Sequence, residues 1–298
     1  MSSNATYAYY PGCSGLSTSL DYEQSTRAIC SALGITLQDI PDWSCCGSTP
    51  AHTVDHVLSA ALSARNLAIA ESMGVDAVVT PCPSCLTNLK AAGHRMENDR
   101  FKKEVNALLD QPCANSLTTK SVMQILVEDY GVEEIQKAVS NPLQGLKVVP
   151  YYGCLMNRPP EVMDFDDPEN PTAMDRILTA LGLEVLDFPL KVECCGGSFG
   201  VARKDMVVHL SGKLLDMARK LGADAVVTAC PLCQMNLDLR QSQINAGLRE
   251  TFDLPVFYYT QLLGLALGLS HDELLLKKLV VTPWNVLKKV EEQEAVAV

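Results

Sequence analysis

The sequence predicts an α/β protein of two tandem, pseudo-symmetric domains, each a small open parallel sheet flanked by helices. Two observations lead to this fold class. The motif Gly-x-Asp-Ala-Val-Val-Thr occurs at residues 74–80 and again at 222–228, and both copies run into a Cys-Pro-x-Cys element. In each half, short apolar runs alternate with helical patterns, and this alternation is typical of parallel sheets with right-handed crossovers. The length of 298 residues agrees with about two domains of ordinary size.

Each expected element of the first half has a counterpart in the second. Apolar runs predict strands that end just before cysteine-containing loops, and the amphipathic stretches between them predict helices. Gly34 and Gly182 close the first helix of each half, as glycine commonly does at a helix end. We therefore expect strands at 5–10, 35–40 and 76–80 with helices at 20–34 and 56–73, and then strands at 146–152, 183–188 and 224–228 with helices at 172–182 and 207–221.

The duplication divides the chain into two domains. The first, 1–145, contains a longer polar segment at 93–120 that we expect to be helical. The second, 146–298, carries an acidic, proline-rich insertion at 157–171 and a helix-like tail at 284–290. The insertion is interpreted as a loop over a substrate cleft, a partner contact or a neutral surface loop. The tail is interpreted as a partner contact or an amphipathic surface helix.

Ten of the twelve cysteines repeat in the same order in both halves. A lone cysteine is followed by Cys-Cys-Gly and then by Cys-Pro-x-Cys. From the lone cysteine to the pair there are 31 and 39 intervening residues, and from the pair to the last element 35 and 34. We name the two groups the first nest (Cys13, Cys45, Cys46, Cys82 and Cys85) and the second nest (Cys154, Cys194, Cys195, Cys230 and Cys233).

Every cysteine element of a nest follows the end of a predicted strand. Ligands of open parallel sheets bind outside the carboxyl ends of the strands, so we expect the five cysteines of each nest to converge there. The Cys-Pro-x-Cys elements also open a helix, whose N-terminal N–H groups favour thiolate over thiol. The pattern therefore predicts two equivalent sites for metal or redox chemistry.

The number of thiols in each nest narrows that chemistry. A simple dithiol site would need only the Cys-Pro-x-Cys element, and structural zinc takes four ligands. Five thiolates suit an iron–sulfur cluster better, with zinc in one site as the less favoured alternative. Glycine after each Cys-Cys pair lets the backbone approach such a cluster closely. Cys30 and Cys113 have no counterpart and are interpreted as buried small residues.

Composition and missing motifs argue against several classes of function. The formal net charge of −11 argues against non-specific nucleic-acid binding, which needs a basic surface. The sequence shows neither a signal peptide nor an apolar run long enough to span a membrane, so we expect a cytoplasmic protein. It contains no ferredoxin-type cysteine run, G-x-G-x-x-G fingerprint or Walker A motif. Electrons must then come from a partner that carries other redox groups.

Two cysteine-rich CCG domains in one chain, opened by Tyr9-Tyr10-Pro11-Gly12-Cys13, closely resemble the B subunit of heterodisulfide reductase from methanogenic archaea and its bacterial relatives. The resemblance covers nearly the whole chain. It implies one noncubane [4Fe–4S] cluster in each nest, and binding of the coenzyme M–coenzyme B heterodisulfide between the clusters. It further implies reductive cleavage to two thiols, with the C subunit of that complex supplying cubane clusters and its A subunit supplying a flavin.

The disulfide implied by this resemblance carries sulfonate, carboxylate and phosphate groups, which local cations would bind. Candidate substrate-binding residues, all within ten positions of a nest cysteine, are His52, Arg158, Lys191, Arg203 and Lys204. A solvated surface role is the alternative for each of them. Two other functions also remain open for the chain. CCG domains occur in thiol-dependent fumarate reductases and in glycolate and lactate oxidation systems, and a zinc or electron-transfer scaffold would have no substrate.

Overall fold

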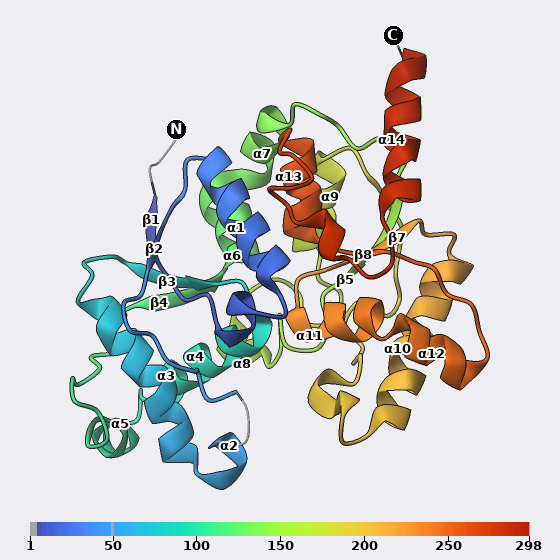
Figure 1. Ribbon diagram of the computed structural model, residues 1–298. Coiled ribbons are helices and arrows are strands. Elements are labelled where there is room, and N and C mark those ends of the chain that lie inside the picture. The colour runs from blue at the N-terminus through green and yellow to red at the C-terminus, as the bar shows by residue number, and fades with distance from the viewer. Residues whose placement is uncertain (1–4, 49–50, 298) are drawn as a thin grey trace.

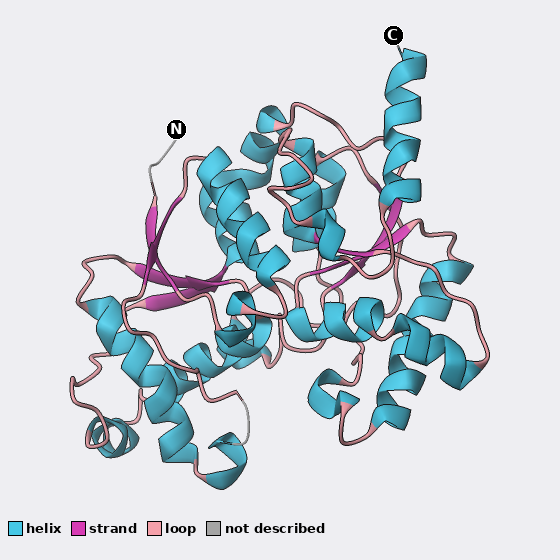
Figure 2. Cartoon of the chain, viewed as in Figure 1, coloured by secondary structure: helices cyan, strands magenta, loops and turns pink. Residues whose placement is uncertain are grey.

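The structure is a computed structural model that describes residues 5–48 and 51–297, with side chains up to residue 290. Each half of the chain forms one four-stranded parallel sheet (Figure 2). The strand orders are the same, β2-β1-β3-β4 and β6-β5-β7-β8, which confirms the predicted fold class. The strands are β1 (Thr6–Tyr9), β2 (Thr36–Asp39), β3 (Ala77–Thr80), β4 (Thr118–Ser121), β5 (Lys147–Tyr151), β6 (Glu184–Val185), β7 (Ala225–Thr228) and β8 (Val256–Tyr258).

The three strands expected in each half are present, and each sheet has a fourth strand that we did not expect. Strand β4 lies at the end of the segment 93–120, which we expected to be helical throughout. That segment instead contains the end of α4 (Pro83–Arg95), α5 (Asp99–Asn106) and an irregular stretch before β4. The sequence of β4, Thr-Thr-Lys-Ser, lacks an apolar run, and the strand is defined by its backbone pairing with β3.

The helices that follow the strands occupy the expected places (Figure 1). Gly34 and Gly182 end the first helix of each half with left-handed φ angles of 73° and 87°, a conformation that glycine adopts without a steric penalty. The helices are α1 (Leu20–Ala32), α2 (Ala51–Val54), α3 (His56–Glu71), α6 (Val122–Gln124), α7 (Val132–Ala138), α8 (Pro160–Met163), α9 (Ala173–Ala180), α10 (Lys204–Lys220), α11 (Pro231–Gln234), α12 (Gln241–Leu248), α13 (Tyr259–Ala266) and α14 (Trp284–Ala297), with the short η1 (Cys13–Leu16), η3 (Gly197–Gly200) and η5 (Leu276–Lys278) and the π-helical η2 (Ile125–Gly131) and η4 (Met235–Leu239).

The two halves share one apolar core. Helices α1, α6, α9 and α13 lie between the sheets (Figure 1), and their buried side chains form a single cluster that includes residues of both halves. The rings of Tyr22 and Tyr258 stack across this junction with centroids 4.2 Å apart and planes at 1°. Nearby, the hydroxyls of Ser25 and Thr260 lie 2.7 Å apart in a buried hydrogen bond. Two further cores lie on the outer faces of the sheets, under α3 and α4 and under α10 and α12.

The proline-rich insertion and the tail both join this arrangement. Helix α8 of the insertion packs on α4 of the first half, where the Lys90 ammonium donates a hydrogen bond to the carbonyl of Met163. Leu287 and Val290 of α14 are buried in the shared core, while the helix continues outward (Figure 1). Within the described part of the chain, none of the helices combines the length and the apolar character that a membrane crossing needs.

Replacement of Leu262 by Ala should destabilise both halves together. Leu262 is fully buried in the shared core, so the substitution removes contacts and leaves a cavity, at a cost of about 2–5 kcal/mol in the free energy of unfolding. Leu239→Ala is the control, because Leu239 is 51% exposed and its loss should cost under about 0.5 kcal/mol. Denaturant titration measures the free energy of unfolding of each variant. Equal losses of stability in the two variants would contradict the shared core.

Candidate functional site

The cysteines of each nest lie beyond the carboxyl ends of the strands. In the first half, Cys13 begins η1 just after β1, and Cys82 is the N-cap of α4 just after β3. The Cys45-Cys46-Gly47 loop follows β2. The second half repeats this placement, with Cys230 as the N-cap of α11 after β7. Parallel pairing brings these strand ends to one edge of each sheet, where ligands of such sheets bind.

The sulfur atoms within each nest are close enough to influence one another. In the second nest, the Sγ atoms of Cys195 and Cys233 lie 3.6 Å apart. Burial raises the pKa of Cys154 to about 12, and negative charge on Cys194, Cys195 and Cys230 adds to this shift. The same holds in the first nest, where burial and then the charges of Cys45, Cys46 and Cys82 raise the pKa of Cys13. Each group of five therefore forms one electrostatic unit.

At least one buried thiol in each nest is biased towards the thiolate, and in the first nest a hydrogen bond with Cys85 also lowers the pKa of Cys82. A hydrogen bond with Cys85 lowers the pKa of Cys46 to about 7. The equivalent bond with Cys233 lowers the pKa of Cys195 to about 6. Both thiols are buried, at 2% and 3% exposure. Since thiolate is the form that binds metal, these two residues are prepared for coordination at neutral pH.

Matching hydrogen bonds hold the two Cys-Cys-Gly loops. The Ser63 hydroxyl donates to the Cys46 carbonyl at 2.8 Å, and the Tyr10 hydroxyl donates to the Ser44 carbonyl at 2.7 Å. These bonds fix the loop from α3 and from the end of β1. The second half has the same two bonds, from Ser211 to Cys195 at 2.8 Å and from Tyr151 to Glu193 at 2.7 Å.

A glycine makes room for a sulfur atom in each nest. A Cβ on Gly12 would lie 3.0 Å from Sγ of Cys85, and a Cβ on Gly153 would lie 3.0 Å from Sγ of Cys233. Both glycines also have left-handed φ angles, 75° and 73°. Any side chain at these positions would therefore strain the backbone and crowd the thiol.

The donor set of each nest fits an iron–sulfur cluster. Five cysteines supply only soft sulfur ligands, which such clusters prefer, and the two glycines leave space beside the sulfurs. Among the described residues, no group of three or more His, Cys, Asp or Glu side chains is arranged to hold a metal ion. The five thiols of each nest come from three separate segments of the chain.

Tyr258 lies at the junction of the two halves, where it stacks on Tyr22, and no motif in the sequence indicates it. Its side chain is fully buried, and its hydroxyl has no hydrogen-bond partner in the described structure. Burial raises its pKa well above the ordinary value, and the charges of Asp21, Cys230, Cys82 and Cys233 raise it further. Of these cysteines, Cys82 belongs to the first nest and Cys230 and Cys233 to the second.

A cavity of about 340 Å³ lies beside the first nest and is lined from both halves. It adjoins the Cys-Cys-Gly loop through Ser48 and the lone Cys154 through Leu155. Of the five expected substrate-binding residues, His52 lines this cavity. Arg95 lines it as well and was missed, although Cys85, Asn88 and Arg95 follow helical spacing along one face of α4. Its polar and charged lining residues include Ser48, His52, Thr87, Asn88 and Arg95.

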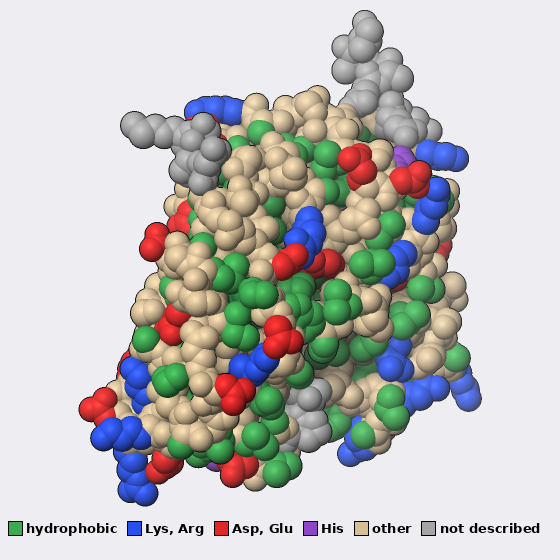
Figure 3. Space-filling model, turned by 60° about the vertical axis from the view of Figure 1, so that its left-hand side comes forward, with side chains coloured by type: hydrophobic (Ala, Val, Ile, Leu, Met, Phe, Trp, Pro, Cys, Tyr) green, Lys and Arg blue, Asp and Glu red, His purple; other side chains and the backbone are tan. Residues whose placement is uncertain are grey.

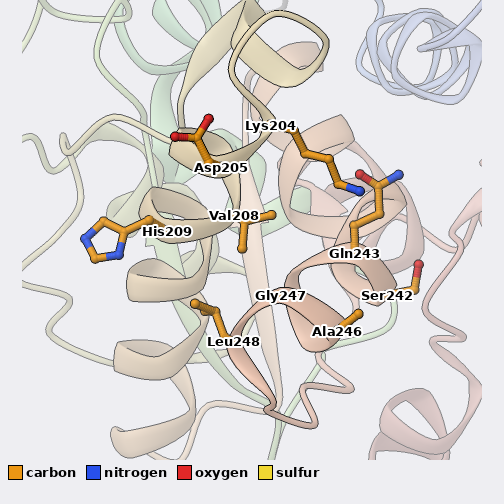
Figure 4. Close-up of a pocket in the computed structure, with 9 residues that line it drawn as sticks. All are labelled: Lys204, Asp205, Val208, His209, Ser242, Gln243, Ala246, Gly247 and Leu248. Carbon is orange, nitrogen blue, oxygen red and sulfur yellow. The ribbon is translucent and has the colours of Figure 1, made fainter.

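The other four expected substrate-binding residues have protein partners or lie elsewhere. Arg158 pairs with Glu169 at 2.7 Å within the insertion, and Arg203 pairs with Asp205 at 3.0 Å. Lys191 is buried and contacts the Asp175 carboxylate at 2.6 Å. Lys204 lines a separate pocket of about 720 Å³ between α10 and α12, where it extends towards Gln243 (Figure 4).

The two unmatched cysteines lie outside the nests, as part of the packing. Cys30 belongs to the shared core and Cys113 to the outer core of the first half, both 1% exposed. Burial raises their pKa values to about 12 and about 11.

On the surface, hydrophobic side chains gather in the middle of the face shown in Figure 3, with acidic and basic side chains interspersed around them.

The chain is similar to known cysteine-rich redox proteins. The family model described as "Cysteine-rich domain" (CCG) matches residues 7–90 and again 148–238. The 8-methylmenaquinol:fumarate reductase membrane anchor subunit of Wolinella succinogenes is 36% identical over 90% of this chain and 94% of that one. The B subunit of the ferredoxin:CoB-CoM heterodisulfide reductase of Methanosarcina mazei is 30% identical over 92% and 93%, respectively.

A third relative, from Archaeoglobus profundus, is described as similar to the B subunit of heterodisulfide reductase and is 30% identical over 97% of this chain and 99% of its own. These matches confirm the resemblance inferred from the cysteine pattern. Among solved structures, a hypothetical protein from Helicobacter pylori superposes with a TM-score of 0.72 over 93% of this chain and 52% of that chain. Its identity of 13% makes this a likeness of fold alone.

Replacement of Gly153 by Ala should disturb the second nest beyond its effect on the backbone. Gly222→Ala is the matched control, because Gly222 has a similar φ of 75° but nothing within 4 Å of its added Cβ. Both variants should lose about 1 kcal/mol of stability from left-handed strain. Gly153→Ala alone should also lose roughly half of the iron retained after anaerobic purification, since one of two clusters is affected. Equal iron content in the two variants would show that the space Gly153 leaves beside Cys233 does not matter for iron binding.

Proposed function

Since this chain belongs to the family of CCG cysteine-rich domain proteins, we propose that its two nests act together in the reductive cleavage of a small disulfide. Its relatives are subunits of oxidoreductase complexes, and the family membership makes this chain an iron–sulfur redox protein of such a complex. The finer proposal is that each nest holds one noncubane [4Fe–4S] cluster through its five cysteines. The coenzyme M–coenzyme B heterodisulfide is the substrate proposed on the similarity to the B subunits of heterodisulfide reductases.

The observation that supports this proposal is the presence of two equivalent cysteine nests, each beyond the strand ends of its own sheet, in two halves that share one core. The cavity beside the first nest is lined from both halves. Cleavage of a disulfide to two thiols takes two electrons and two protons. The clusters, when bound, would supply these electrons one at a time. Two sites beside one bound disulfide meet that requirement without a two-electron cofactor in this chain.

The residues of the chain have separate tasks in this reaction. Ser63 and Ser211 fix the carbonyls of Cys46 and Cys195, which keeps the ligand loops in place. The cavity beside the first nest admits a small substrate, and His52 and Arg95 in its lining would bind anionic groups such as sulfonate or phosphate. Three thiols of each nest are buried, which strengthens the charge interactions among them, whereas Cys13, Cys45 and Cys194 are exposed to solvent.

The partners are proposed from the same similarity. A protein like the C subunit of heterodisulfide reductase, with cubane clusters, would pass electrons to this chain. A flavin-containing protein like the A subunit would in turn feed electrons to those cubane clusters. The cytoplasmic location inferred from the sequence stays a prediction.

A second function is favoured by the 36% identity to the membrane anchor subunit of the Wolinella succinogenes fumarate reductase. In that case the two nests would relay electrons within a quinol-linked complex, and no disulfide would bind. The two functions differ in whether the isolated chain turns over a disulfide.

Replacement of Cys195 by Ala should remove one cluster and abolish disulfide reduction. Iron should fall from about eight to about four atoms per chain, since each nest would hold four. Cys113→Ala is the control, because Cys113 is buried to a similar degree but lies outside both nests. Both variants would be assayed anaerobically with reduced viologen and the coenzyme M–coenzyme B heterodisulfide. Iron-loaded wild-type protein without turnover would favour the relay function, and full activity of Cys195→Ala would refute the ligand assignment.

A further inference from the structure

The two halves differ at the asparagine that lies three positions after each Cys-Pro-x-Cys element. Asn88 holds this position in the first half and Asn236 in the second. Asn88 belongs to the regular helix α4, where its amide donates a hydrogen bond to the carbonyl of Ser84, one turn earlier, at 2.7 Å. Asn236 belongs to the π-helical η4, which begins at Met235. Its amide bonds outside its own helix, to the Cys-Cys-Gly loop and the residue after it.

The amide of Asn236 contacts the second nest directly. Its Nδ2 atom lies 3.4 Å from Sγ of Cys195 and 2.9 Å from the carbonyl oxygen of Gly197. A backbone carbonyl only accepts hydrogen bonds, so the bond to Gly197 requires the nitrogen, and not the oxygen, of the amide on this side. The second N–H of the same nitrogen is thereby directed at the sulfur. Asn236 is fully buried, so solvent does not compete for these bonds.

The counterparts of these residues in the first half are arranged differently. Ser48 and Asn88 correspond to Gly197 and Asn236, and both line the cavity beside the first nest. Asn88 is only half-buried. Within residues 5–48 and 51–297, its amide donates to the Ser84 carbonyl and forms no hydrogen bond with a nest sulfur. The nests therefore contain the same cysteines but differ in this amide donor.

We propose that Asn236 is a positioning residue of the second nest, whose side-chain N–H donates a hydrogen bond to the Cys195 sulfur and raises the reduction potential of the cluster held there. The inference rests on the proposed function, since it requires a cluster in that nest. Reduction makes a cluster and its sulfur ligands more negative, and a hydrogen bond to sulfur stabilises that state. One amide thus distinguishes two sites that have equivalent ligands.

The test compares Asn236→Leu with Asn88→Leu in the full-length, anaerobically purified protein without substrate. Each substitution removes one hydrogen bond to a backbone carbonyl, but only Asn236→Leu also removes a hydrogen bond to sulfur. Asn236→Ala is a second variant, which removes the same donor without the branched side chain of leucine. Iron content and stability to denaturant are measured first. Midpoint potentials are then measured by redox titration followed by electron paramagnetic resonance, and the potential that is missing in Cys195→Ala identifies the second cluster.

We expect the midpoint potential of the second cluster to become more negative in both Asn236 variants, while iron content stays at the wild-type value in at least one of them. The potential of the first cluster should not change, and Asn88→Leu should keep both potentials.

Three results would overturn the positioning role of Asn236: an unchanged potential of the second cluster, an equal shift in Asn88→Leu, or loss of iron or folding in both Asn236 variants. Absence of iron from the wild-type protein would instead overturn the proposed function, and this inference with it.

Discussion

Helices α1 and α13 pack against each other between the two sheets, and the buried side chains around them come from both halves of the chain. Neither sheet could bury its inner face alone, because a sheet with one apolar face needs another layer to cover it. Two contacts across this junction hold the halves together: the stacked rings of Tyr22 and Tyr258, and the hydrogen bond between Ser25 and Thr260. The position of each half, and hence of each nest, depends on this shared core.

The shared core explains why duplication gives one working unit and not two copies of a site. Each nest is built by its own sheet, from loops at the carboxyl ends of parallel strands. The junction then fixes the position of one nest relative to the other, because the core is common to both halves. The α8 insertion adds a second connection, where Lys90 and Thr87 of α4 donate hydrogen bonds to carbonyls of the second half. The proposed two-electron reaction at two one-electron centres would require such a fixed relation between the halves.

Much of this arrangement was predictable from local patterns. The repeat at 74–80 and 222–228 indicated buried third strands, and the spacing of the cysteines indicated loops at strand ends. The fourth strands were missed because Thr118–Ser121 is polar and is defined by pairing with β3. The residues around the cavity could not be chosen from the sequence for a related reason. Distance along the chain from a cysteine selected Lys191, which pairs with Asp175, whereas the place of Arg95 in the cavity lining depends on how α4 faces the second half.

We propose two iron–sulfur clusters in one chain, one in each nest. The most direct test is to measure iron, acid-labile sulfide and zinc per chain in anaerobically purified protein. We expect about eight irons and eight sulfides, the sum of two four-iron clusters, with no zinc. Zinc in place of iron in either nest would contradict the paired arrangement and would indicate a scaffold or a single-cluster relay.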